Sequence, residues 1–139
     1  MANQARDLFT AALELNPQND SSKVGLGSAY LFGAEGVNSP MEGILKIREV
    51  ADRDSSNIYA QFMLGYGALV SGQLDKAIER LLRVTRLQHD HTEAVFLLAE
   101  AYEKSGDKIN AIGWYEKGKK HVSNPQLVGA IDEKIKSLK

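Results

Sequence analysis

A spacing of 34 residues constrains this chain more than any other feature of its sequence. A small residue followed by isoleucine recurs at this interval, at Gly43-Ile44, Ala77-Ile78 and Ala111-Ile112. The dipeptide Ser71-Gly72 returns at Ser105-Gly106 with the same interval of 34. Each interval holds two stretches whose apolar residues have helical spacing, and glycine can adopt the left-handed conformation that ends a helix. The period therefore predicts a series of helix-turn-helix units.

The segment 58–90 shows this unit in full. Apolar residues follow helical spacing over 58–71 and again over 74–87, and Gly72 separates the two runs. Asn124-Pro125 is expected to begin a last helix with one apolar and one charged face. The residues expected to fill the space between helices are Leu64, Ile78, Leu81, Leu98 and Tyr102.

The residues at repeated positions carry a family resemblance. Leu26-Gly27-Ser28-Ala29-Tyr30 fits the pattern Leu-Gly-x-x-Tyr in full, whereas Leu64-Gly65 with Ala68 and Leu98-Ala99 with Tyr102 fit it in part. On the second helices, Ala77 with Leu81 and Ala111 with Tyr115 fit Ala-x-x-x-Phe. The sequence thus resembles bacterial-type members of the tetratricopeptide repeat family over nearly its whole length. The resemblance implies an all-α fold, a right-handed α-solenoid of antiparallel helix pairs with about eight helices.

We expect a single domain over 1–139. It comprises a half repeat at 3–17 that has only the second helix, repeats at 20–55, 58–90 and 92–123, and a capping helix at 125–138. The repeat at 20–55 carries an insertion of about four residues at 33–39, read either as a tolerated surface insertion or as a protruding binding edge. The half repeat indicates either a piece of a longer chain or an apolar flank that contacts another copy.

Composition and motifs exclude several functions. The formal net charge of −1 gives no basic field for nucleic acid, and no apolar run long enough for membrane insertion is present. The chain has no cysteine, which excludes thiolate chemistry, and its sequence contains no phosphate loop or catalytic motif. We therefore expect that the chain is not an enzyme and that it binds no cofactor and no metal. His89 and His91 flank Asp90, but Asp90 is expected to cap the next helix. The compartment stays open: the cytoplasm is slightly favoured, and the periplasm fits if a signal or anchor was removed.

The resemblance also implies where a partner would bind, because first helices of such repeats line a concave groove. The alternative is that its aromatic residues pack between helices. Some related domains bind the C-terminal carboxylate of a partner through Lys, Asn and Arg on this face. The corresponding positions here are Val24, Ser28, Glu93 and Leu97, so we do not expect recognition of a C-terminal carboxylate. The expected groove residues are Val24, Ser28, Leu31, Phe32, Tyr59, Phe62, Tyr66, Leu69, Val70, Glu93, Phe96, Glu100 and Glu103.

The function predicted from the sequence is a non-catalytic scaffold or adaptor. Its partner would be another protein, through a peptide or helix with apolar anchors that bind in the groove. The alternative is a structural section of a longer solenoid, or a self-associating unit that forms a homodimer through its N-terminal half repeat. Nucleic acid and membrane are not expected among the partners.

Overall fold

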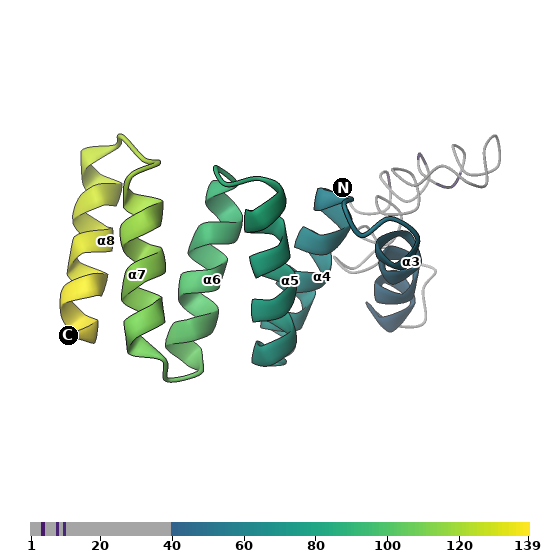
Figure 1. Ribbon diagram of the computed structural model, residues 1–139, viewed down its shortest axis with the longest axis horizontal. Helices are drawn as coiled ribbons and strands as arrows, with labels where there is room; N and C mark the ends of the chain where they lie inside the picture. The colour runs from purple at the N-terminus through teal and green to yellow at the C-terminus, as the bar shows by residue number, and fades with distance from the viewer. Residues whose placement is uncertain (1–3, 5–7, 9, 11–39) are drawn as a thin grey trace. The chain divides into compact units, whose positions relative to one another are not determined.

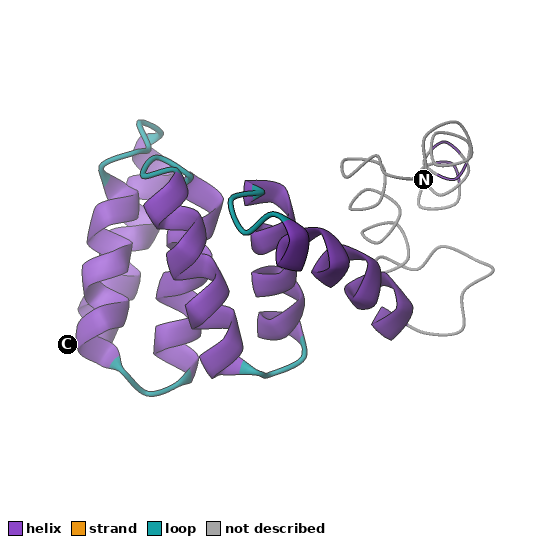
Figure 2. Ribbon diagram, turned by 45° about the vertical axis from the view of Figure 1, so that its right-hand side comes forward, coloured by secondary structure: helices purple, strands orange, loops and turns teal. Residues whose placement is uncertain are grey.

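The computed structural model describes residues 40–139 together with residues 4, 8 and 10, and the chain forms two compact units, Met1–Gly67 and Ala68–Lys139. All regular structure in the described residues is helical, as predicted (Figure 2). The two further helices of the predicted eight, most of the half repeat at 3–17 and the insertion at 33–39 lie outside the described residues. The helices are α3 (Pro40–Arg53), α4 (Ile58–Val70), α5 (Leu74–Leu87), α6 (Thr92–Lys104), α7 (Lys108–Lys119) and α8 (Pro125–Leu138).

The described part of the first unit is built on an apolar core between α3 and α4. Ile47, Val50 and Ala51 from α3 meet Ala60, Met63 and Leu64 from α4, and all six are buried. The amide of Gln61 is also fully buried, and its Nε2 donates to the carbonyl of Ser55 at 3.2 Å. That bond satisfies a polar group which would otherwise destabilise the core.

In the second unit, four helices stand side by side in chain order (Figure 1). Each packs on its successor: α5 on α6, α6 on α7 and α7 on α8. Of the expected core residues, Leu64, Leu81 and Leu98 are buried, whereas Ile78 and Tyr102 are half-buried. The apolar side chains that fill this unit's core are Leu69, Ala77, Leu81, Val84, Ala94, Val95, Leu98, Ala99, Ala101, Ala111, Ile131 and Ile135.

Two glycines reverse the chain, as the sequence predicts for Gly72. Gly72 has φ +81° and Gly106 has φ +87°. The N–H of Gly106 donates to the Glu103 carbonyl at 3.1 Å, and the next N–H, of Asp107, donates to the Tyr102 carbonyl at 2.9 Å. One repeat earlier, the backbone at Gly72 makes the same two hydrogen bonds at the equivalent positions. This pattern satisfies the last carbonyls of a helix and requires a residue that tolerates positive φ.

Side chains cap the N-termini of α6, α7 and α8, with one correction to the sequence prediction, whereas Gln73 makes no side-chain bond at the start of α5. His91, not Asp90, caps α6: its Nδ1 accepts from the N–H of Ala94 at 3.2 Å. Asp107 caps α7 by accepting from the N–H of Asn110 at 3.1 Å. The wrong assignment followed from the general preference for aspartate, because His91 stands one residue closer to the first turn and can make the same bond.

A close contact between α6 and α7 requires glycine. Gly118 is buried, and a Cβ placed on it would lie 2.6 Å from Cε1 of Phe96. The Phe96 ring therefore covers the backbone of α7 at this position. Gly113, on the same helix, is exposed and has nothing within 4 Å of such a Cβ.

Gly118→Ala should destabilise the fold, because the added methyl group forces the Phe96 ring out of its position. We expect a loss of about 1–3 kcal/mol in the free energy of unfolding. The matched variant Gly113→Ala adds the same methyl group in open space, so it should stabilise the chain by up to about 1 kcal/mol through helix propensity. Urea unfolding followed by circular dichroism measures both. Equal changes in the two variants would contradict the packing described for Phe96.

Candidate functional site

Helix α4 presents an unusual surface because none of its 13 residues is charged. Tyr59, Phe62 and Tyr66 are spaced by three and four residues, which places them on one face of the helix. Tyr59 is 49% exposed, and Phe62 and Tyr66 are half-buried. Phe62 packs in part against the core formed with α3. We call these three residues the aromatic row of α4.

Leu69 and Val70, the last two groove residues predicted on α4, differ in their exposure. Leu69 is only 5% exposed, so its side chain belongs to the interior. Val70 is 70% exposed. Because hydrophobic periodicity does not distinguish a core position from a neighbouring surface position, the sequence placed both on the same surface.

The acidic residues of α6 are largely engaged within the fold. Glu100 pairs with Lys104 at 3.0 Å, one turn further along the helix. Glu103 accepts from the hydroxyl of Tyr115 at 2.8 Å and pairs with Lys134 of α8 at 3.2 Å. Glu103 thus links α6 to both α7 and α8, which the sequence did not indicate. Glu93 is exposed at the start of the helix.

The bond between Tyr115 and Glu103 affects the ionisation of Tyr115. Burial raises the pKa of the Tyr115 hydroxyl above its usual range, and the bond to Glu103 together with the charges of Glu103 and Glu100 raises it further. The pKa of Tyr102 is raised too, by burial and by the charge of Asp107. In each case the surroundings favour the neutral phenol over the phenolate.

The remaining predicted residues fall into two groups. Phe96 is half-buried and its ring lies against Gly118, so it packs between helices, as the alternative interpretation of the aromatic residues had it. Val24, Ser28, Leu31 and Phe32 lie outside the described residues. In the part of the chain that the structure describes, no group of three His, Cys, Asp or Glu side chains could hold a metal ion.

A cavity that the sequence analysis missed lies in the second unit. It has a volume of about 450 Å³ and is lined by residues of α5, α6 and α7 and of the turns that follow α5 and α7. Trp114, the only tryptophan of the chain, lines it beside Leu82 and Val95. One signal could have indicated its basic residues: Arg86 of α5 returns 34 residues later as Lys120, and both line the cavity.

Comparison with known proteins supports the helical-repeat architecture. Residues 62–123 match the tetratricopeptide repeat family. A crystal structure of the MamA protein has a TM-score of 0.72 at 24% identity, covering 96% of this chain and 73% of that one. YrrB, described as a TPR protein with an unusual peptide-binding site, has a TM-score of 0.75 at 19% identity, covering 96% of this chain and 66% of that one. No curated protein matches the chain significantly. At these identities the likeness concerns the fold.

Antiparallel helices joined by short glycine turns at a fixed period define a helical-repeat protein. Its particular class follows from the match to residues 62–123: this segment belongs to the tetratricopeptide repeat family, which confirms the resemblance found in the sequence. Repeats of this family suggest a scaffold for protein–protein interaction. None of the helices in the described residues has the length and apolar character to span a membrane.

Glu103→Gln should lower the pKa of Tyr115 while leaving it above the ordinary value for tyrosine, because burial remains. The neutral phenol is favoured in the folded state, so Tyr115 contributes stability that is complete below about pH 10 and is lost as the pH rises further. Carbon-13 NMR of the tyrosine Cζ atoms follows each phenol separately. Tyr102 is the internal control, since its pKa should hardly change. An unchanged titration of Tyr115 would show that Glu103 does not contribute.

Proposed function

We propose that this chain is a non-catalytic protein-binding scaffold, and that the aromatic row of α4 anchors a peptide or helix with apolar side chains. The observation that carries the proposal is an uncharged helix whose aromatic side chains remain accessible on one face. A helix that is apolar on all sides is normally buried on all sides. Tyr59 instead leaves half of its surface in solvent, and tyrosine provides both apolar area and a hydroxyl for hydrogen bonding.

The acidic residues of α6 have a smaller part in this proposal. Glu100 and Glu103 already pair with Lys104 and Lys134, so attraction of a basic segment would depend mainly on Glu93. Phe96 supports the fold through its contact with Gly118. The specificity that we propose therefore comes from apolar anchors rather than from charge.

Tyr59→Ala and Tyr66→Ala should each weaken binding of a peptide selected against the wild-type chain. We expect selection from a displayed library of helical peptides to give apolar residues at positions i, i+3, i+4 and i+7, with micromolar affinity, about −8 kcal/mol. Each tyrosine truncation should cost about 1–3 kcal/mol of that, measured by isothermal titration calorimetry. Phe62 is a poorer test, because its truncation also disturbs the core.

Ile109→Ala provides the matched control. Ile109 lies on α7 and is 86% exposed, so the variant removes a comparable apolar side chain from a different surface and should bind the selected peptides as the wild type does. Wild-type affinity in both tyrosine variants would refute the aromatic row as the binding surface. Loss of binding in Ile109→Ala alone would place the peptide elsewhere.

One observation favours the second candidate, a self-associating unit. Leu8, which belongs to the half repeat predicted at 3–17, is 72% exposed. Light scattering coupled to size exclusion separates the two proposals. A concentration-dependent dimer that Leu8→Glu abolishes would support self-association through this segment. The chain has a mass of 15.3 kDa, and a monomer of that mass at all concentrations would leave peptide binding as the function.

A further inference from the structure

The cavity between α5 and α7 combines an apolar floor with a cationic rim. Leu82 and Trp114 are half-buried, and Val95 is only 2% exposed. Together they form the apolar lining of a cavity of about 450 Å³, which has room for an aliphatic or aromatic side chain and for chain atoms on either side of it. The hydroxyl of Thr85, also in the lining, donates to the carbonyl of Leu82 at 2.9 Å. The floor therefore offers shape and apolar contact, and the exposed imidazoles of His89 and His121 lie at the turns that complete the lining.

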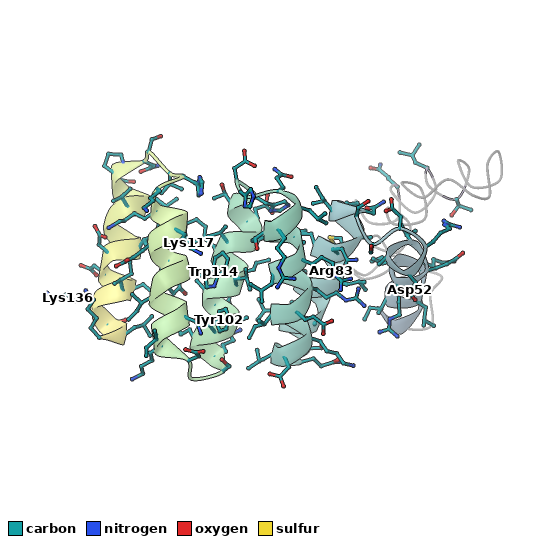
Figure 3. The ribbon with its side chains drawn as sticks, viewed as in Figure 1. Asp52, Arg83, Tyr102, Trp114, Lys117 and Lys136 are labelled. Carbon is teal, nitrogen blue, oxygen red and sulfur yellow. The ribbon has the colours of Figure 1, made fainter. Side chains whose placement is uncertain are left out.

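The rim of the cavity carries positive charge from two helices. Arg86 comes from α5, Lys117 from α7 and Lys120 from the residue after α7, and all three are exposed. No carboxylate belongs to the lining, although the chain as a whole has a net charge of −1. Arg83 of α5 and Lys117 of α7, both labelled in Figure 3, occupy the same position of successive repeats. Arg83 itself does not line the cavity, but the charged residues that do, Arg86, Lys117 and Lys120, are all basic.

The ammonium of Lys117 connects the rim to the floor. Its Nζ lies 4.1 Å from the centroid of the Trp114 ring, a distance at which a cation is attracted by the aromatic face. This contact holds the charge at the edge of the apolar surface. A ligand can therefore pair an anionic group with Lys117 and place an adjacent apolar group against the tryptophan.

We propose that this cavity binds an acidic peptide segment of another protein, with one apolar side chain on the floor and flanking carboxylates at the rim. The rim charges come from flexible, exposed side chains on two helices, which suits a chain extending beyond the cavity better than an enclosed small molecule. Nucleic acid would need a broader basic surface than the three cations described here. This binding surface involves α5, α6 and α7, so it does not depend on the aromatic row of α4.

The single tryptophan allows a direct test. The probe is a short synthetic peptide with one central leucine flanked by glutamates, titrated into the full chain while the fluorescence of Trp114 is followed. We expect saturable binding that weakens as sodium chloride is raised, since exposed charges are screened. Replacing the leucine by glycine, or the glutamates by lysines, should remove the saturable signal.

Variants of the rim locate the interaction. Arg86→Gln and Lys120→Gln should each weaken binding by about twofold to fivefold, as expected for exposed charge pairs. Lys136→Gln is the matched control: it removes one positive charge from an exposed position on α8, outside the cavity, and should bind as the wild type does (Figure 3). Circular dichroism should show the same unfolding midpoint for all three variants.

Four outcomes would overturn the proposal. The first is no saturable change with the glutamate–leucine peptide, and the second is equal weakening by Lys136→Gln. The third is equal competition by free glutamate or inorganic phosphate, which would indicate a small-anion site. The fourth is tighter binding of a short single-stranded oligonucleotide than of the peptide, which would indicate a nucleic-acid surface.

Discussion

The end of each first helix at a glycine with positive φ is the constraint on which the second unit depends. At Gly72 and Gly106 the backbone bonds satisfy the last carbonyls and turn the chain back on itself. Because both turns occur at the same position of the repeat, α5 and α7 begin at equivalent points. Ala77 and Ala111 then stand at corresponding positions, and both are fully buried. Small residues there allow neighbouring helices to approach closely, so the turn and the packing depend on each other.

Contacts between successive helices add to this framework at particular residues. The Phe96 ring covers Gly118, which is possible only because glycine leaves space for it. Glu103 joins α6 to α7 through Tyr115 and to α8 through Lys134. Lys119 of α7 pairs with Asp132 of α8 at 2.8 Å, which ties the last helix to its neighbour. In a repeat protein, stability comes from such contacts between neighbours rather than from one central core.

The two proposed binding surfaces differ in their chemistry. The aromatic row of α4 has no charged residue on its helix, whereas the cavity beside Trp114 is rimmed by Arg86, Lys117 and Lys120. An uncharged surface selects partners by shape and apolar area, and a cationic rim selects for acidic segments. A scaffold with both could hold two partners of different composition, because neither surface uses the residues of the other.

The sequence by itself determined the all-α class, the 34-residue period, the turn at Gly72 and the core positions of Leu64, Leu81 and Leu98, because repeated spacing and glycine chemistry are local properties of the chain. Only the tertiary structure decided what the side chains at those positions do. Periodicity placed Glu103 and Phe96 on a binding face, but contacts with α7 and α8 engage both. Helices α5 and α6 also bring Leu82 and Val95 to the cavity that Trp114 lines. Helical spacing defines a face, and only the neighbouring helix decides whether that face meets protein or solvent.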